Sequence, residues 1–469
     1  MKRTTIAIVW HRFRADRRGA VAIIVALSIL GLVGTAGLGI DYYNALAAKS
    51  RLDLASDAAA IAAINAAQSY IAANSGSQTD PTLTAGAITA GKAQAQKVFY
   101  SNAGSTANIA TTPGVTMSRS GQTFNANISY QAASQNAFGP MFGVKQFNLV
   151  GGSASSLTMG KYLDFYLLLD VSGSMGLPTT NQGQQQLAAI SPDQKDQYPS
   201  GCAFACHFSQ KMCSTIQYPQ KVGPPQTCQG YNLARSNNIE LRADSVGKAV
   251  QALLSTATAT ETITNQFRVG LYPFIVHAGT LYAISNNLNG AQTSAGTLGT
   301  LLDTGQSTTP YGSGGTHFEN AIPELNSLIT TIGDGSGALK PQPFVFLVTD
   351  GADNSQTYTT SSNKWCCLTG SPAANSAPQN MDPTLCTALK SRGITVSVLY
   401  IPYPPINPPN PKFAGDEDDK VNAIIPTIPS KLQACASPGF YFSAYTPQDI
   451  TNAMQAMFQQ SLAAARLTQ

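Results

Sequence analysis

Charged residues are scarce in this chain of 469 residues, because Asp, Glu, Lys and Arg make up only 11% of it. Cytosolic globular proteins carry about a quarter, so the composition indicates a chain that works outside the cytoplasm. The formal net charge of +4 is concentrated at the start, where residues 1–18 hold six basic side chains and one acidic one. The remainder has a net charge of about −1, and nothing in it predicts binding to nucleic acid.

Signatures of the common enzyme classes are also lacking. The chain has no Gly-x-Ser-x-Gly turn, no phosphate-binding Gly-x4-Gly-Lys-Ser/Thr loop and no His-Glu-x2-His motif. Phosphoryl transfer through Asp170 and Mg²⁺ is the rival class, but it would need a general base and a phosphate-binding lysine, and neither is evident. The sequence therefore predicts a protein that is not an enzyme.

One long apolar run stands near the amino terminus. Residues Gly19 to Ile40 contain no charge, and as a helix these 22 residues would span about 33 Å, enough for a hydrocarbon core of about 30 Å. The basic flank lies before the run, so the amino terminus should stay cytoplasmic and everything after Asp41 should lie outside. A cleaved signal peptide is the alternative, but its apolar core is usually about 7–15 residues. We expect an uncleaved single-pass anchor.

A second apolar run, Phe165 to Leu169, is followed at once by Asp170, Ser172 and Ser174. The run predicts a fully buried strand, and the loop at its carboxyl end holds one carboxylate and two hydroxyls in one turn. Hard oxygen donors at this spacing suit Mg²⁺, Mn²⁺ or Ca²⁺ rather than zinc. Taken alone, the same string also fits a turn or a helix N-cap.

Two later segments bring further oxygens to the same place. Another apolar run, 344–348, ends at Thr349 and Asp350, and a glycine-rich loop, 312–316, ends at Thr316 before a helical stretch from Phe318 to Ile332. The loops that follow parallel strands emerge at one edge of a sheet, so these side chains could meet around one ion. The predicted metal ligands are Asp170, Ser172, Ser174, Thr316 and Asp350.

This set of residues resembles the metal-ion-dependent adhesion site (MIDAS) of von Willebrand factor type A domains. The resemblance implies that the hydroxyls contact the metal directly or through water. It also implies that the aspartates either contact the metal directly or hydrogen-bond to the groups that do. It also implies an open coordination position that accepts a carboxylate from a bound partner. From Lys161 onward, strands and helices alternate as in a doubly wound, mostly parallel, Rossmann-like α/β sheet, which is the fold of that family.

The amino-terminal segment carries a second resemblance. Arg17-Arg18-Gly19-Ala20 precedes the apolar run, Asp41-Tyr42 follows it, and Leu54 to Ala63 reads Leu-Ala-Ser-Asp-Ala-Ala-Ala-Ile-Ala-Ala. Residues 15–67 are similar to the start of tight-adherence (Tad) pilus-assembly proteins, in the TadG-like branch with a von Willebrand A domain. The resemblance implies a bacterial inner-membrane protein whose bulk faces the periplasm and a role in Tad, or Flp, pilus assembly.

Between the anchor and the α/β domain we expect an extended helix and a small pilin-like α+β region. The Ala-rich stretch from Tyr42 to Ile71 should prolong the membrane helix, and a second helix is predicted near Ile88 to Phe99. Three strands are predicted at Val115–Arg119, Thr123–Tyr130 and Phe147–Leu157. The predicted organisation is a cytoplasmic segment (1–18), a transmembrane helix (19–40), this region (41–160) and a von Willebrand A domain (161–469) with Cys-rich insertions at 177–238 and 357–381.

The chain has eight cysteines. On the outer side of a membrane they most simply form four disulfides, but eight cysteines allow 105 pairings and the connectivity stays open. The adjacent Cys366 and Cys367 are not expected to pair with each other. A zinc site at Cys202, Cys206, His207 and Cys213 is the alternative, although its spacing departs from the usual Cys-x2-Cys.

Together these features predict a membrane-anchored, periplasm-facing protein that binds an acidic side chain of a protein partner through a divalent metal, during assembly or anchoring of a pilus. Mg²⁺ is the expected ion, with Mn²⁺ or Ca²⁺ as substitutes. The alternative is a structural scaffold or pseudopilin in which the metal site is vestigial.

Overall fold

The computed structural model describes residues 18–74, 80–109, 112–190, 234–303, 310–312, 314–355, 358–359, 364–365, 378–403, 405 and 418–467. The chain divides into two compact units, unit 1 (Met1–Met159) and unit 2 (Gly160–Gln469). Each unit has its own apolar core. The predicted insertions 177–238 and 357–381, with six of the eight cysteines, lie largely outside the described residues.

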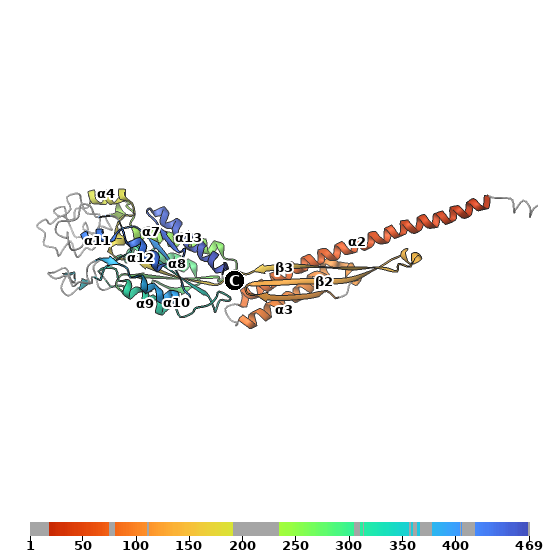
Figure 1. The fold of residues 1–469 in the computed structure, drawn as a ribbon, viewed down its shortest axis with the longest axis horizontal. Helices are drawn as coiled ribbons and strands as arrows, with labels where there is room; N and C mark the ends of the chain where they lie inside the picture. The colour runs from red at the N-terminus through yellow and green to blue at the C-terminus, as the bar shows by residue number, and fades with distance from the viewer. Residues whose placement is uncertain are drawn as a thin grey trace, which may run out of the picture. The chain divides into compact units, whose positions relative to one another are not determined.

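Unit 1 is built on one continuous helix, α2 (Arg18–Asn74), so the predicted extension of the apolar segment is present. Helix α3 (Asp80–Ala103) packs along it and is longer than predicted. Three antiparallel strands, β1 (Gly114–Ser120), β2 (Thr123–Gln135) and β3 (Gln146–Thr158), form a sheet in the order β1-β2-β3. Figure 1 shows β2 and β3 as a long hairpin beside α2.

Helix α2 changes character along its length. Every residue from Val21 to Val33 is exposed, whereas buried positions recur from Gly34 onward. Small residues such as Ala55, Ala59 and Ala63 are fully buried, which lets α3 and the sheet approach the helix closely. The first part of α2 is therefore apolar and uncovered by protein, and it is the one described helix long and apolar enough to cross a membrane.

Unit 2 contains a six-stranded sheet in the order β13-β12-β7-β4-β5-β6. All neighbouring pairs are parallel except β5 and β6, which are antiparallel. In chain order this is the 3-2-1-4-5-6 arrangement of a doubly wound α/β fold, so the predicted fold class is confirmed. The strands are β4 (Leu163–Asp170), β5 (Phe267–Phe274), β6 (Tyr282–Ser285), β7 (Gln342–Thr349), β12 (Thr395–Tyr400) and β13 (Tyr441–Ser443).

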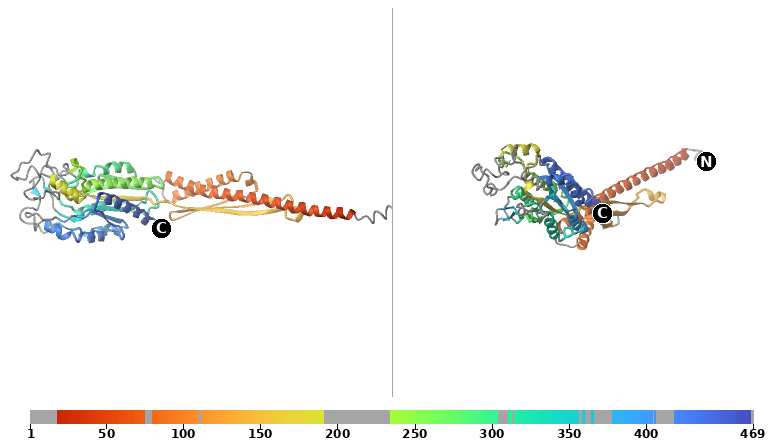
Figure 2. Two further views of the ribbon diagram at one scale, coloured as in Figure 1. Left: turned by 90° about the horizontal axis from the view of Figure 1, so that it is seen from above. Right: turned by 60° about the vertical axis from the view of Figure 1, so that its left-hand side comes forward.

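Helices cover both faces of this sheet. Side chains alternate along β4, so Phe165, Leu167 and Leu169 join one core cluster and Tyr166 and Leu168 join the other. The first cluster is closed by α7 (Arg242–Thr260), α8 (Leu288–Ala295) and α13 (Pro447–Leu467), and the second by α9 (Phe318–Leu328), α10 (Thr387–Ser391) and α12 (Ile428–Cys435). Figure 2 shows these two layers from two further sides.

Several elements differ from the sequence prediction. Helix α9 ends at Leu328 rather than Ile332, and the expected helix 382–392 is a 3-10 turn, η6 (Pro383–Cys386), followed by the short α10. The side chain of Asp382 accepts a hydrogen bond from the Thr384 N–H and caps this turn. The sequence did not predict five short elements: strand β6 and helices α8, α12, α4 (Asn181–Ile190) and α11 (Asp418–Ile424). Elements this short show little hydrophobic periodicity in the sequence.

The remaining elements are turns and two-residue strands. They are η1 (Gly104–Ile109), η2 (Gly139–Phe142), η3 (Gly173–Gly176), η5 (Leu298–Leu301), β8 (Ala352–Asp353), β9 (Tyr358–Thr359), β10 (Lys364–Trp365) and β11 (Gln379–Asn380). Strand β8 pairs with β11, and β9 pairs with β10.

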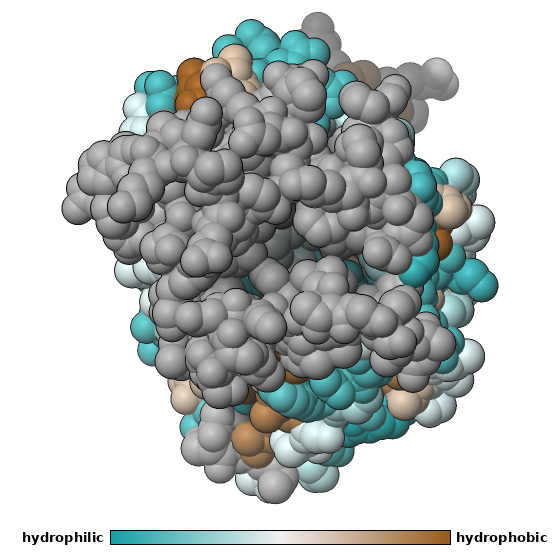
Figure 3. Space-filling model, turned by 90° about the vertical axis from the view of Figure 1, so that its left-hand side faces the viewer, coloured by the Kyte–Doolittle hydropathy of each residue, from teal (hydrophilic) through white to brown (hydrophobic). Residues whose placement is uncertain are grey.

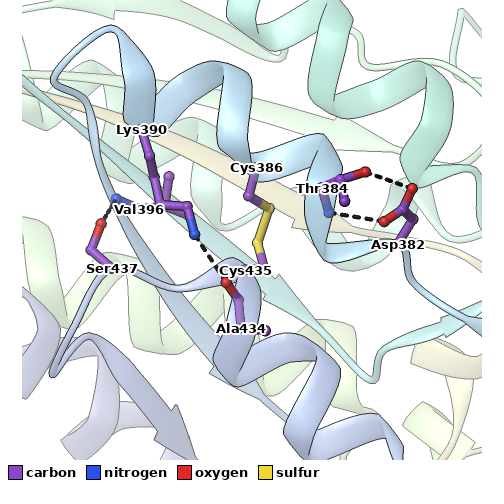
Figure 4. Close-up of a disulfide and its surroundings, with 8 residues drawn as sticks. All are labelled: Asp382, Thr384, Cys386, Lys390, Val396, Ala434, Cys435 and Ser437. Carbon is purple, nitrogen blue, oxygen red and sulfur yellow. Dashed lines mark hydrogen bonds between the residues drawn. A yellow bond between two sulfur atoms is a disulfide. The ribbon is translucent and has the colours of Figure 1, made fainter.

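One disulfide is described, between Cys386 in η6 and Cys435 in α12 (Figure 4). The Lys390 Nζ donates to the carbonyl oxygen of Ala434 at 2.9 Å, close to the same bond. Helix α12 in turn places Ile428 and Leu432 against Gly351, whose positive φ of 81° requires glycine. Because Gly351 follows Asp350, the disulfide stabilises the layer that supports one of the predicted metal ligands.

Removing this disulfide tests its contribution. We expect Cys386→Ser with Cys435→Ser to lower the free energy of unfolding of unit 2 by about 2–4 kcal/mol, because the bond closes a loop spanning 49 positions and so restricts the unfolded chain. Urea denaturation of the full-length protein would measure it. Unchanged stability would show that α12 is held in place without the bond.

Candidate functional site

The first predicted ligand lies at the carboxyl end of the central strand β4. Asp170 is completely buried. Its Oδ1 accepts a hydrogen bond from the Ser172 backbone N–H at 2.9 Å, and its Oδ2 accepts one from the Thr349 Oγ1 at 2.6 Å. The first bond curls the loop back on the strand end, and the second ties β4 to the neighbouring strand β7. The carboxylate is therefore fixed in position by both strands.

The two serines follow this carboxylate in the loop that leaves β4. The hydroxyl oxygens of Ser172 and Ser174 are 3.2 Å apart, and the turn η3 begins between them. Burial raises the pKa of Asp350, and Ser174 lies close enough to its carboxylate to oppose part of that rise. The structure thus brings Asp170, Ser172, Ser174 and Asp350 together at one edge of the sheet.

Asp350 is also completely buried, and it faces a cation from the same chain. The Arg242 Nη1 lies 3.2 Å from Asp350 Oδ2, and both side chains are almost wholly inaccessible to water. The Arg242 Nη2 also donates to the carbonyl oxygen of Pro402 at 2.7 Å, and the guanidinium lies over the ring of Tyr403. Within the part of the chain that the structure describes, Asp350 Oδ1 has no hydrogen-bond partner.

Thr316 reaches the same edge through its backbone. Its N–H donates to the Asn354 carbonyl oxygen at 2.9 Å, and the N–H of the next residue, His317, donates to the Ile275 carbonyl oxygen at 2.9 Å. These contacts place Thr316 beside Asn354, which follows β8, and close to Ile275, which follows β5. The hydrogen bonds of the described residues do not link its hydroxyl to the other four predicted ligands, so its contact with an ion stays a prediction.

The loop that carries Thr316 is held by an aspartate that the sequence did not reveal. Asp303 donates its backbone N–H to the Val171 carbonyl oxygen at 3.0 Å, and its Oδ2 accepts from the Gly314 N–H at 2.7 Å. Gly314 and Gly315 have φ angles of 96° and 63°, which glycine adopts at little cost. The glycine-rich loop is thereby bound to the loop that carries Ser172.

Two other residues of the site were missed in the sequence. Thr349 directly precedes the predicted ligand Asp350, but the sequence did not predict that its hydroxyl orients Asp170. Arg242 was not singled out, although a signal existed: it occupies the same stripe of α7 as the buried Val246 and Ala249. A charged residue on an apolar helical stripe usually has a buried partner of opposite sign.

Burial controls the electrostatics of the two carboxylates. Burial, together with the nearby charge of Asp350, raises the pKa of Asp170 to about 7. Burial also raises the pKa of Asp350, against the opposing effect of the Arg242 charge. When both aspartates are ionised, the three side chains carry a net charge of −1, so a cation at this edge would relieve an uncompensated buried charge.

The donor set fits a hard divalent ion. The site offers two carboxylates and two adjacent serine hydroxyls, and one oxygen of the Asp350 carboxylate accepts no hydrogen bond from the described residues. These are the oxygen donors that Mg²⁺ and Mn²⁺ prefer. The described residues contain no group of three or more His, Cys, Asp and Glu side chains placed to hold a metal. Hydroxyls would therefore have to complete the coordination.

The two histidines near this edge have local partners. His277 Nδ1 lies 2.7 Å from Glu324 Oε1, and His317 Nδ1 lies 2.9 Å from Glu319 Oε1 at the start of α9. In the space-filling view from the side of α4 and α11, the visible described residues are mostly hydrophilic, with small hydrophobic groups among them (Figure 3).

Asp353, three residues beyond Asp350, gives a test of pH dependence. It is buried, and burial together with the charge of Glu319 raises its pKa to about 7. Because the folded state binds this proton more tightly than the unfolded state, stability falls as pH rises from about 4 through 7. We expect Asp353→Asn to raise the free energy of unfolding by on the order of 2 kcal/mol at pH 8 and to change it little at pH 4. An equal effect at both pH values would contradict a buried, protonated Asp353.

No protein-family model matches the chain, and no curated protein sequence matches it. The chain is similar to solved structures at low identity. Proximal thread matrix protein 1 from the mussel byssus is 12% identical, over 65% of this chain and 49% of that one, with a TM-score of 0.31. The pilus adhesin SpaC from Lactobacillus rhamnosus GG is 11% identical, over 75% of this chain and 34% of that one, with a TM-score of 0.33.

The conserved hypothetical protein BatB from Bacteroides thetaiotaomicron is 14% identical, over 64% of this chain and 99% of that one, with a TM-score of 0.33. One form of the mussel protein has a zinc-occupied MIDAS motif. The chain spans about half the length of the mussel protein and about a third of SpaC. Similarity at this level identifies neither a family nor a function for this chain.

Proposed function

We propose that the chain is a membrane-anchored adhesion protein that captures an acidic side chain of a protein partner through a divalent metal at the carboxyl edge of the unit 2 sheet. One observation carries the proposal: Asp170, Ser172, Ser174 and Asp350 meet at that edge, around two buried carboxylates that a single Arg242 does not neutralise. The ion would be Mg²⁺, or Mn²⁺ or Ca²⁺ in its place.

The charge balance explains why a partner's carboxylate would bind. With Asp170, Asp350 and Arg242 all charged, adding a divalent ion changes the net charge of the site from −1 to +1. A cation with an unfilled coordination position then attracts an anionic ligand. Ser172 and Ser174 would supply neutral oxygens, so they would hold the ion without cancelling this positive charge.

The anchor is the apolar part of α2. Residues Val21 to Val33 are exposed along the helix, which suits contact with lipid. The same helix continues without a break into the core of unit 1. That continuity favours a retained anchor over a cleaved signal peptide. The basic residues before it favour a cytoplasmic amino terminus and an extracytoplasmic unit 2.

We further propose that the partner is a component of a Tad pilus or of its assembly machinery, in a bacterial inner membrane. The proposal rests on the resemblance of residues 15–67 to TadG-like proteins. A structural scaffold or pseudopilin is the second candidate, favoured by the long helix packed on a small antiparallel sheet in unit 1.

Imaging of pili separates the two candidates. Native cells in which Asp170→Asn replaces the wild type should lose surface pili, while the protein stays at normal abundance in the membrane. Asp334→Asn is the matched control, because this exposed aspartate lies outside the site. Normal pili with Asp170→Asn, together with loss of pili on deletion of the gene, would leave only the scaffold role.

A further inference from the structure

The hairpin tip, residues 136–145 between β2 and β3, contacts α2 within the segment proposed to cross the membrane. Phe142 and Phe138 lie directly on the helix backbone at Gly34 and Gly37, where even a Cβ atom would meet the rings. The Phe138 and Gly139 backbone N–H groups donate to Asp41 Oδ2, each at 2.8 Å, and the Ala137 N–H donates to Oδ1 at 2.9 Å. The tip is therefore fixed to α2.

The position of these contacts along α2 determines how deep in the bilayer they would lie. Gly34 lies six residues before Ile40, which is about 9 Å along a helix. The stretch from Gly19 to Gly34 alone would span only about 24 Å, too short for a hydrocarbon core of about 30 Å. If α2 crosses the bilayer, as the proposed function requires, then Gly34 lies inside its outer leaflet, and Phe142 lies beside it.

The side chains of the hairpin tip suit that environment. Met141 and Phe142 are 62% and 49% exposed, and Val144 is 39% exposed. Phe142 meets α2 at Gly34, directly after the exposed apolar stretch from Val21 to Val33, so the tip and the helix expose apolar side chains at neighbouring positions. Lys145 is exposed at the base of the tip, where a lysine can reach lipid phosphates.

Most backbone N–H groups of the hairpin tip have partners inside the protein, which is what an apolar medium requires of polar groups. Besides the three bonds to Asp41, the N–H groups of Asn136, Met141, Gly143 and Val144 donate to carbonyl oxygens within the tip, at 3.0–3.1 Å. Pro140 has no N–H to satisfy. These internal bonds lower the cost of moving the tip out of water, because the N–H groups of an exposed loop normally bond to water.

We infer that the hairpin tip inserts into the outer leaflet of the membrane, with Met141, Phe142 and Val144 in contact with lipid acyl chains. The insertion gives unit 1 a second attachment to the bilayer, beside α2. It holds unit 1 against the membrane surface instead of leaving it free to swing on a single helix.

Fluorescence quenching in vesicles tests the inference. The full-length chain, with Trp10→Phe and Trp365→Phe as background, is given a single tryptophan and reconstituted into phosphatidylcholine vesicles with or without bromine on the acyl chains. Phe142→Trp should lose most of its emission in the brominated vesicles. Ser156→Trp, at the far end of β3, should be unaffected. Leu27→Trp, in the apolar part of α2, should be quenched. Met141→Trp repeats the measurement without altering the contact at Gly34.

Three results would overturn the inference. If Leu27→Trp is quenched but both tip variants behave like Ser156→Trp, then α2 spans the bilayer and the tip lies outside it. If the tip variants are shielded from acrylamide but not quenched by brominated lipid, then protein rather than lipid covers the tip. If Leu27→Trp is not quenched, then α2 does not span the bilayer, and both the proposed anchor and the insertion of the tip are refuted.

Discussion

Arg242→Met is expected to lower the free energy of unfolding by about 3–5 kcal/mol when metal is removed by a chelator, because it leaves the buried Asp350 carboxylate without its cation. Adding Mg²⁺ should restore part of that loss, since the ion can replace the missing positive charge. The stabilisation by Mg²⁺ should be larger in the variant than in the wild type. Thermal unfolding of the full-length protein with chelator and with Mg²⁺ measures both effects.

Lys248→Met is the matched control for Arg242. Lys248 lies on the same helix α7, and its Nζ pairs with Glu240 at 2.8 Å, but its side chain is 65% exposed. An exposed pair contributes at most about 1 kcal/mol, and its loss should not depend on Mg²⁺. If Arg242→Met is as stable as the wild type under chelation, or is not rescued by Mg²⁺, then Arg242 does not balance the charge of the site.

Asp170→Asn should have opposite effects in the absence and presence of metal. Without metal at pH 8 it should stabilise the protein, because it removes a buried charge whose pKa is raised to about 7. The Asn side chain keeps the shape of Asp, and its Oδ1 can still accept from the Ser172 N–H. With Mg²⁺ at about 100 times its Kd, the wild type should gain about 2.7 kcal/mol, and the variant should gain nothing.

The pH dependence of the metal effect follows from the same carboxylate. Asp170 must lose its proton before it can bind a cation, so Mg²⁺ should stabilise the wild type strongly at pH 8 and progressively less as pH falls through 7. Denaturation curves at pH 5.5 and 8, with and without Mg²⁺, measure the difference. A stabilisation by Mg²⁺ that is equal at both pH values, or is retained in Asp170→Asn, would exclude Asp170 as a ligand.

The parts of the fold that the sequence predicts well are those with strong local signals. The apolar runs before Asp170 and before Asp350 predicted the two central parallel strands, because buried strands have continuous apolar sequence. Order along the chain then placed the two aspartates at one edge of the sheet. The edge strand β6, at Tyr282–Ser285, is short and partly exposed, so its sequence carries no comparable pattern.

The contacts that complete the site depend on pairs far apart in the chain, which a single sequence does not specify. Arg242 and Asp350 are 108 positions apart, and Asp170 and Thr349 are 179 apart. The same limit applies to the disulfide between Cys386 and Cys435 and to the contact of the hairpin tip with α2. In each case the residue types indicate a need for a partner, and only the fold shows which partner it is.

The most direct test of the metal site is a titration of the metal-free full-length chain with Mn²⁺ at pH 8, in which electron paramagnetic resonance measures the free ion. We expect one Mn²⁺ to bind per chain, to be displaced by Mg²⁺, and to be lost in Asp170→Asn and in Ser172→Ala with Ser174→Ala. If the wild type binds no Mn²⁺, or if these variants bind it as the wild type does, the four residues at the end of β4 and β7 do not form a metal site.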